Sequence, residues 1–349
     1  MMIVKRQKGI LGLLLLSLAL LVGNSSCDRM LFDKLEHCPR GILVHVYAQT
    51  PCENQPTYPK QIKEVTLFAF DENGVLAGTT EAKNLQLSHE AEPILLPVKT
   101  DGLYQVVGWS GLSSDLFEKG TIKVGETKLT DLYVTLKKEA SKAVSLDGRS
   151  LWISQPKQIV VVKPISDEKS EQYVSFGLNM REVTNRIRFT IKNLRNPDEV
   201  TMRVVAKNGA YLHSGAIDKG ESYIYSVSEI EKVENTIDNS HNPSGAAPRF
   251  NGSRSETFTL LSLDDFGEPR IHLEYHNDGK VHLLSSDKLD ENIAALIRSV
   301  SNGAKNPQCE NEFEVVVELA YCATCSDGYV VVRIEILPWG VHSTNQVLG

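Results

Sequence analysis

Arg186-Ile187-Arg188-Phe189-Thr190-Ile191-Lys192 is the stretch that decides the fold class. Apolar and polar residues alternate in it, so three apolar side chains point to one face and four polar side chains to the other. A period of two is that of a β-strand with one buried face, which is typical of antiparallel sheets. The stretch therefore predicts an all-β protein whose sheets each pack one face on a core.

The same alternation recurs along most of the chain. Turn signals such as Asp71-Glu72-Asn73-Gly74, Asn208-Gly209, Asp278-Gly279 and Asp327-Gly328 separate the candidate strands. Many short strands joined by such turns indicate β-sandwiches. The other candidate strands are Gly41–Ala48, Val65–Phe70, Tyr104–Trp109, Leu132–Leu136, Ile159–Val162, Val200–Val204, Phe258–Leu263, Phe313–Leu319 and Tyr329–Leu337.

One stretch, Asp290–Val300, predicts a helix, because Ile293, Leu296, Ile297 and Val300 fall on one helical face. Strands and helices do not alternate, so doubly wound nucleotide-binding folds are excluded.

The length of 349 residues suits about two domains of ~150 residues each. Two polar stretches interrupt the strand pattern. Pro164–Gln172 predicts a linker, and Asp238–Glu256, rich in Asn, Ser, Gly and Pro, predicts a long exposed loop. We therefore expect one sandwich at residues 38–166 and a second at residues 172–349.

The N-terminus has the order of an export signal. Lys5-Arg6-Gln7-Lys8 is a basic region, and the apolar run from Ile10 to Val22 is shorter than the ~20 residues that span a bilayer. Ser25 and Ser26 then precede Cys27, and small residues before a cysteine at this place resemble the lipobox of bacterial lipoproteins. The resemblance implies a signal peptide at residues 1–26, lipidation of Cys27 and a tether at residues 27–37. The alternative is a conventional secretory signal with an incidental cysteine.

Five further cysteines are candidates for disulfide bonds: Cys38, Cys52, Cys309, Cys322 and Cys325. An odd number in an exported protein leaves at least one free thiol or an intermolecular bond. Cys38 and Cys52 flank one candidate strand and could close a small loop. Cys322-Ala-Thr-Cys325 has the spacing of a redox motif or half a zinc site, but it lies in a polar turn between strands. We expect a disulfide or packing role for these thiols rather than catalysis.

Formal charge and motifs exclude several function classes. The 37 basic and 44 acidic residues give a net charge of −7 without a basic block, which argues against nucleic acid and against charge-based adhesion to anionic lipid headgroups. Phosphate-binding glycine loops, HExxH and GxSxG are absent from the sequence. We therefore predict no enzyme, no catalytic residues and no cofactor.

His272, His276 and His282 are the only histidine grouping that invites a metal. On one strand face the α-carbons of His272 and His276 are about 13 Å apart, too far for direct shared ligation. A two-residue turn at Asp278-Gly279 pairs Tyr275 with His282 and puts His282 on the opposite face; a three-residue turn would reverse this. We predict an exposed polar strand face and no metal site.

Several stretches occur in an order that points to one family. They are Cys38-Pro39-Arg40-Gly41, Ile62-Lys63-Glu64-Val65-Thr66-Leu67-Phe68-Ala69-Phe70-Asp71-Glu72-Asn73-Gly74, Tyr104-Gln105-Val106-Val107-Gly108-Trp109-Ser110-Gly111-Leu112, Met180-Arg181-Glu182-Val183-Thr184-Asn185-Arg186-Ile187-Arg188-Phe189 and Val332-Arg333-Ile334-Glu335-Ile336-Leu337-Pro338-Trp339. After a lipobox-like cysteine, this series resembles the FimB/Mfa-type fimbrial anchor family of Bacteroidetes over nearly the whole mature chain.

The resemblance implies two tandem transthyretin-like β-sandwiches on a lipid anchor at the outer membrane, exposed at the cell surface. Such proteins anchor a fimbrial shaft and limit its length, and relatives occupy tip positions. Shaft subunits assemble by donor-strand exchange, a form of β-augmentation. The segment that we expect to donate or accept a strand is Tyr329–Leu337, with Tyr329, Val330, Val332, Ile334 and Ile336; an ordinary internal strand is the alternative. Arg40 is a weak candidate for the cleavage that activates shaft relatives.

Three functions compete at this stage. The first is a lipid-anchored fimbrial subunit whose partners are shaft pilins and the outer membrane. The second is a fimbrial tip or surface protein that binds a glycan or host ligand, which would need exposed aromatics, whereas Trp109, Trp152 and Trp339 lie in strand patterns. The third is a secreted zinc or thiol enzyme. The lipobox-like cysteine, the paired sandwiches and the absence of catalytic motifs favour the first.

Overall fold

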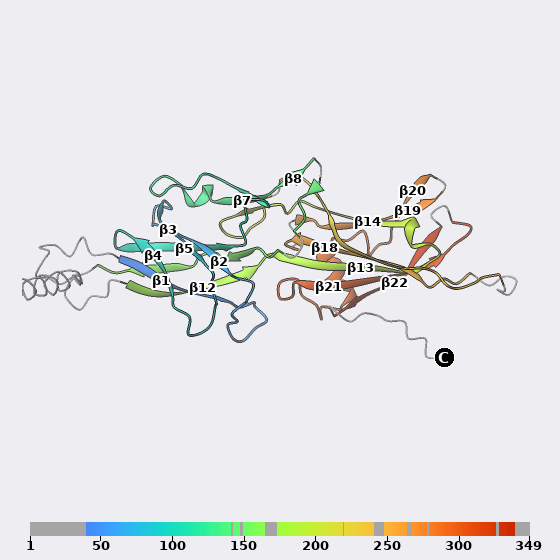
Figure 1. The fold of residues 1–349 in the computed structure, drawn as a ribbon, viewed down its shortest axis with the longest axis horizontal. Coiled ribbons are helices and arrows are strands. Elements are labelled where there is room, and N and C mark those ends of the chain that lie inside the picture. The colour runs from blue at the N-terminus through green and yellow to red at the C-terminus, as the bar shows by residue number, and fades with distance from the viewer. Residues whose placement is uncertain are drawn as a thin grey trace, which may run out of the picture.

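A computed structural model of the chain describes residues 40–140, 142–146, 149–164, 173–218, 220–240, 248–263, 267–277, 279–325 and 328–338. These residues form an all-β protein, as the alternating pattern predicted, with sheets arranged along one long axis (Figure 1). Cys27, Cys38, the predicted signal peptide and tether, most of the predicted linker and Trp339 lie outside the described residues. No helix in the described ranges is long and apolar enough to cross a membrane.

The first part of the molecule is an eight-stranded sheet with its own core, and we call it the N-terminal half. Its strand order is β3-β2-β5-β10-β12-β1-β4, with β11 paired to β5, and only β1 and β12 run parallel to each other in it. The two end strands approach closely, since a Cβ atom on Gly78 of β3 would lie 2.0 Å from the carbonyl oxygen of Pro97 on β4. The sheet therefore curls until its edges meet. The strands are β1 (Arg40–Ala48), β2 (Glu64–Phe70), β3 (Leu76–Lys83), β4 (Ile94–Val98), β5 (Gly102–Ser110), β10 (Trp152–Ser154), β11 (Ile159–Val162) and β12 (Tyr173–Glu182).

The second part of the molecule consists of two sheets and the short helix α2 (Ile293–Val300), and we call it the C-terminal half. The five-stranded sheet, in the order β17-β18-β13-β21-β22, contains β13 (Thr184–Leu194), β17 (Val227–Val233), β18 (Gly252–Leu261), β21 (Glu312–Tyr321) and β22 (Tyr329–Leu337). The six-stranded sheet, in the order β20-β19-β14-β16-β9-β8, contains β8 (Lys138–Glu139), β9 (Lys142–Ala143), β14 (Val200–Ala206), β16 (Tyr223–Tyr225), β19 (Arg270–Asn277) and β20 (Lys280–Leu284).

A three-stranded sheet of β6 (Phe117–Lys119), β7 (Tyr133–Leu136) and β15 (Ala210–Leu212) completes the fold. Its strands come from both sides of the predicted linker, because β15 pairs with β7. The short β9 also crosses, pairing with β16 of the C-terminal half.

The predicted domain limits, 38–166 and 172–349, do not coincide with the sheets. Strand β12 begins after the linker but pairs with β1 and β10 of the N-terminal half. Its Leu178 and Met180 are buried in that half's core. The change from one half to the other falls at Val183, between β12 and β13. Sequence polarity marks a loop, whereas the sheet that a strand joins is set by long-range pairing.

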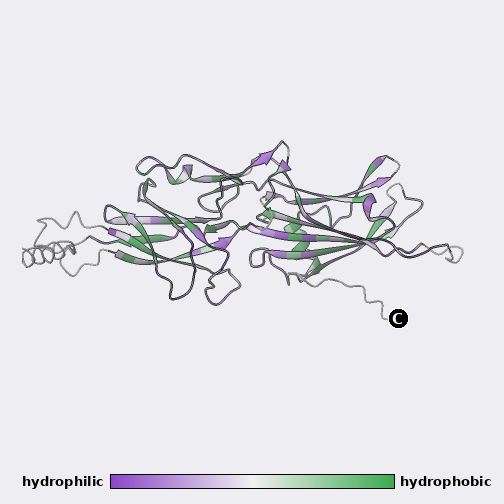
Figure 2. Ribbon diagram, viewed as in Figure 1, coloured by the Kyte–Doolittle hydropathy of each residue, from purple (hydrophilic) through white to green (hydrophobic). Residues whose placement is uncertain are grey.

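Apolar side chains form two clusters. The smaller lies in the curled sheet and includes Ile42, Leu67 and Val106. The larger begins on the other face of β2 and β5, where Phe68 packs edge-on against Trp109 at 5.5 Å, and extends through the small sheet into the C-terminal half. Figure 2 shows the hydrophobic residues along the strands of both halves, while β8 at the periphery is hydrophilic. The two halves therefore share one of their cores.

Most strand predictions are confirmed. Ile159–Val162 and Tyr329–Leu337 have the predicted bounds, and the deciding stretch lies inside β13. The predicted helix begins later than Asp290, since the Asn292 side chain caps it by accepting a hydrogen bond from the Ala295 backbone N–H (2.8 Å).

The predicted loop Asp238–Glu256 is wrong at its C-terminal end. Strand β18 begins at Gly252, and Arg254 and Glu256 are buried in it. The two side chains form an ion pair at 2.6 Å, so polar residues that suggested solvent exposure are accommodated inside the protein.

Candidate functional site

The chain enters the fold at the end of the N-terminal half that lies away from the C-terminal half. Strand β12 leads into β13 across the junction, and β1 runs parallel to β12, so β1 starts at the outer end of the molecule (Figure 1). Arg40 opens β1, pairs in register with Val98 and forms an ion pair with Asp101 at 3.3 Å. A cut after Arg40 would fall inside a paired strand. The lipidation candidate Cys27 precedes this point in the chain.

The structure places four of the cysteines in disulfides. Cys52 bonds to Cys309, with 5.8 Å between their α-carbons, and Cys322 bonds to Cys325. The alternative of a Cys38–Cys52 loop is therefore wrong, because Cys52 pairs across the junction with a residue 257 positions later. That pairing has no signal in the spacing, since it depends on how the two halves meet. The CxxC pair closes the turn between β21 and β22.

The candidate strand-exchange segment is an edge strand that already belongs to the chain's own sheet. Strand β22 pairs with β21 and is the last strand of the five-stranded order. Its candidate residues divide into two sets. Tyr329 is buried, and Ile334 and Ile336 pack against the core, whereas Val330 and Val332 are exposed by 44% and 56%. As a donor the strand would have to uncover Tyr329, whereas its outer edge pairs with no other strand in the described ranges.

The start of β22 is held by aromatic packing around Tyr329. Tyr329 packs edge-on against Tyr275 at 5.0 Å and against Tyr321 at 5.6 Å. Its hydroxyl accepts a hydrogen bond from the Arg195 backbone N–H at 2.9 Å. Burial raises the pKa of Tyr329 to about 12. The start of β22 is thus a fixed part of the C-terminal half.

The histidines follow the two-residue turn. Tyr275 pairs with His282 across the β19–β20 hairpin, and the His276 ring hydrogen-bonds to the Thr201 hydroxyl at 2.8 Å. Burial lowers the pKa of His272. Within the described ranges no group of three or more His, Cys, Asp or Glu side chains is placed to hold a metal ion.

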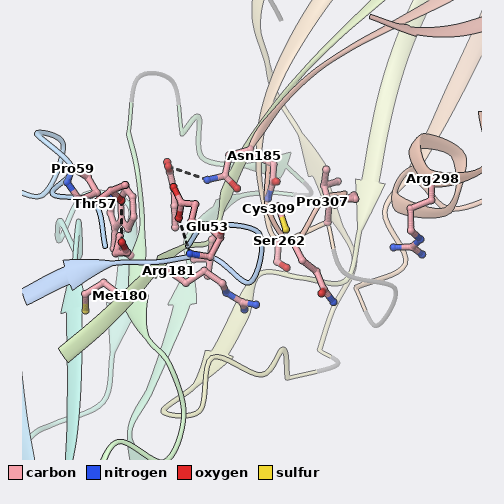
Figure 3. Close-up of a pocket in the computed structure, with 18 residues that line it drawn as sticks. Glu53, Thr57, Pro59, Met180, Arg181, Asn185, Ser262, Arg298, Pro307 and Cys309 are labelled. Atoms are coloured by element: carbon pink, nitrogen blue, oxygen red, sulfur yellow. Dashed lines mark hydrogen bonds between the residues drawn. The ribbon is translucent and has the colours of Figure 1, made fainter. Parts of the chain in front are cut away.

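A pocket of about 350 Å³ lies where the two halves meet (Figure 3). Thr57 and Pro59 line it from the N-terminal half, and Pro307 and Arg298 from the C-terminal half, together with Cys309 of the Cys52–Cys309 disulfide. Sequence reasoning missed this pocket. Its lining comes from segments that are far apart in the chain. One of them, residues 180–185, belongs to a stretch that carried the family resemblance, but none has a catalytic or ligand-binding motif.

Comparison with known proteins decides the family. The profile of the Mfa2 family, described as fimbrillin-A associated anchor proteins Mfa1 and Mfa2, matches residues 35–345. The chain belongs to this family. The resemblance read from the ordered stretches is therefore confirmed.

Individual relatives of the Mfa2 family agree with this assignment. The chain is 29% identical over 326 residues, 93% of either protein, to the minor fimbrium anchoring subunit Mfa2 of Porphyromonas gingivalis. The solved structure of the fimbrial anchor protein Mfa2 from that organism matches with a TM-score of 0.70 and 27% identity, covering 86% of this chain and 98% of that one. A candidate adhesin from Bacteroides thetaiotaomicron shares the fold, with a TM-score of 0.63 at 16% identity over 88% of this chain and 98% of its own.

Proposed function

We propose that this protein is a lipid-anchored subunit that attaches a fimbrium to the outer membrane. The observation that carries the proposal is the match of the anchor-family profile to residues 35–345, which spans almost everything after the lipobox-like segment. In the proposal Cys27 carries the acyl chains, and shaft pilins are the partners.

The direction of the chain supports this arrangement. The segment between Cys27 and Arg40 reaches at most about 45 Å when fully extended. Because β1 starts at the outer end of the N-terminal half, lipid on Cys27 keeps that half near the membrane. The C-terminal half then points away from the membrane, where a shaft subunit can reach it (Figure 1).

Strand complementation at β22 is the contact that we propose with the shaft. A sheet edge offers backbone N–H and C=O groups that pair with an incoming extended segment. β22 is nine residues long, whereas the edge strand β20 has five, so β22 provides the longer ladder. Val330 and Val332 add apolar contact area for alternate side chains of the partner. Such pairing would also regulate where the shaft ends.

Substitution of the acceptor cysteine tests the anchoring. Wild type and Cys27→Ala are labelled with radioactive palmitate in cells, and fimbriae are separated into cell-bound and shed fractions. We expect the variant to lose the label and to release fimbriae into the medium. Loss of label with fimbriae still attached would leave a lipoprotein with another task, such as a tip position. A wild type without label would overturn the lipid anchor.

A further inference from the structure

The junction pocket contains polar groups that no residue in the described part of the chain satisfies. Asn185 is 3% exposed, and its side-chain oxygen has no hydrogen-bond partner among the described residues. Trp152 is 7% exposed, and its indole N–H also lacks a partner; so does the Thr50 hydroxyl. All three residues line the pocket. Buried polar groups are normally hydrogen-bonded, so three unpaired ones around one cavity indicate a ligand that completes them.

The unsatisfied groups restrict the chemistry of that ligand. The Asn185 oxygen needs a donor, the indole N–H of Trp152 needs an acceptor, and the Thr50 hydroxyl takes either. Sugar hydroxyls donate and accept at the same atom, so one polyhydroxy ligand satisfies all three. Inorganic phosphate and sulfate at neutral pH offer mainly acceptors, and a hydrocarbon offers neither.

Arg181 adds a positive charge. Arg181 lines the pocket and the neighbouring one beside Pro51, and its side chain makes no ion pair or hydrogen bond with any residue in the described ranges. The carboxylates in the pocket are engaged elsewhere: Glu182 accepts from Thr184 and Asn311, and Glu53 accepts from the Thr50 backbone N–H. A guanidinium fork fits a ligand carboxylate with two parallel hydrogen bonds.

The remaining lining and the volume agree with a small ring compound. Pro59, Met180, Val183, Leu263 and Pro307 supply apolar surface for the C–H faces of a sugar. About 350 Å³ lies within the range of ligand sites and holds one or two sugar rings. Figure 3 shows the lining arranged around the junction, with Asn185 and Arg181 on the chain that crosses from one half to the other.

We propose that the junction pocket binds an acidic sugar, a hexuronate residue at the end of a glycan. Its carboxylate pairs with Arg181, and its hydroxyls bond to Asn185, Trp152 and Thr50. The site is separate from the lipid anchor and from the β22 edge, so it gives an anchoring subunit a second binding activity.

Calorimetric titration of the full chain in detergent tests the site. The probes are D-galacturonate, D-glucuronate, digalacturonate and the neutral sugars D-galactose and D-glucose. We expect saturable binding of the uronates, with at least about a tenfold preference over the neutral sugars. Binding of all sugars alike, or of none, would overturn the proposal. Binding of an acetylated diglycine carboxylate in place of the sugars would assign the pocket to a peptide and would also overturn it.

Two variants locate the binding. Arg181→Gln removes a side chain without partners, so the protein should fold as before and lose at least about tenfold in uronate affinity. Asn185→Leu should weaken uronates and neutral sugars together. The matched control is Arg203→Gln, which alters an arginine paired with Glu274 on the six-stranded sheet and should leave the affinity unchanged. Uronate binding that survives both pocket variants would place the ligand elsewhere and overturn the assignment.

Discussion

At the scale of single residues, a charged side chain can be buried when an opposite charge pairs with it, so its polarity alone does not predict exposure. Arg254 and Glu256 are two positions apart on β18, 8% and 2% exposed, and bonded at 2.6 Å. Burial raises the pKa of Glu256, and the guanidinium of Arg254 opposes this effect. Arg203 and Glu274 form a similar pair at 3.2 Å on the six-stranded sheet, but their side chains are 46% and 25% exposed. The two pairs differ in solvation far more than in distance.

Removing the arginine of each pair should therefore have different consequences. We expect Arg254→Met to lower the free energy of unfolding by about 3–5 kcal/mol, because it leaves Glu256 buried without its counter-charge. Arg203→Met should cost less than about 1 kcal/mol, because water solvates the remaining carboxylate. Urea unfolding of both variants at neutral pH measures the difference. Equal losses would contradict the distinction.

Tyr329 provides a pH-dependent contribution at the alkaline end. Its pKa is raised from 10.0 to about 12 by burial, so the folded protein keeps the phenol proton over a range in which the unfolded chain releases it. The stability from this group is present below about pH 10 and is lost as the pH rises to about 12. Burial also raises the pKa of Tyr225, which adds to the same trend.

Stability against pH should show the tyrosine directly. Between pH 10 and 12 we expect the wild-type free energy of unfolding to fall more steeply than that of Tyr329→Phe, by up to about 1.4 kcal/mol per pH unit for one proton. Part of the decline remains in the variant because Tyr225 is still present. Denaturant unfolding at several pH values makes the comparison, and parallel curves would show that Tyr329 does not contribute.

At the scale of elements, two edge strands of the C-terminal half present comparable apolar pairs. Val330 and Val332 on β22 are 44% and 56% exposed, and Val281 and Leu283 on β20 are 60% and 51% exposed. Each pair is two positions apart, so the strands resemble each other in exposed side chains and differ in length and in the sheet to which they belong. This similarity provides a matched control for the docking edge.

Lysines introduced on each edge in turn should show which of the two strands binds the shaft pilin. We expect the double variant Val330→Lys and Val332→Lys to fold normally and to retain less shaft pilin in pull-down from cells, because lysine on an edge opposes pairing with an added strand. Val281→Lys with Leu283→Lys should retain pilin as the wild type does. The opposite result would move the docking edge to β20, and no effect of either would exclude both edges.

At the scale of the whole molecule, the two halves are joined in three ways. They share the larger hydrophobic cluster, and the Cys52–Cys309 disulfide links a loop of the N-terminal half to a loop before β21. In addition, β8, β9 and β15 each belong to a sheet that also contains strands from the other side of the predicted linker. The disulfide closes a far longer stretch of chain than Cys322–Cys325, which are three positions apart. In the chain-entropy account, longer closed loops give greater stabilisation.

Removing the disulfide that closes the longer loop should lower the free energy of unfolding more than removing the other. We expect Cys52→Ser with Cys309→Ser to lower the free energy of unfolding by about 2–5 kcal/mol, and Cys322→Ser with Cys325→Ser by about 2 kcal/mol or less. Calorimetry under non-reducing conditions gives both values. A larger loss from the CxxC pair would show that the β21–β22 turn, and not the junction, depends more on its disulfide.

The sequence by itself determined the all-β class, most strands and the family. Alternation along Arg186–Lys192 or Ile159–Val162 is a local property, since one side of the strand must face a core whatever that core contains. The family was inferred from several stretches that resemble it and occur in its order, and the family profile over residues 35–345 confirmed the inference. The sequence left two registers open for the β19–β20 hairpin, and the structure has the one that pairs Tyr275 with His282.

Only the tertiary structure decided which strands, cysteines and side chains contact one another. Strand β12 joins the N-terminal half, and Cys52 bonds to Cys309, through contacts between residues that are far apart in the chain. Arg254 and Glu256 are buried together although their polarity suggested exposure. The pocket of Thr50, Trp152, Arg181 and Asn185 is of the same kind. Alternation records which side of a strand is buried, but hydrogen bonding between strands is the same for any sequence, so the packing of the whole chain selects each partner.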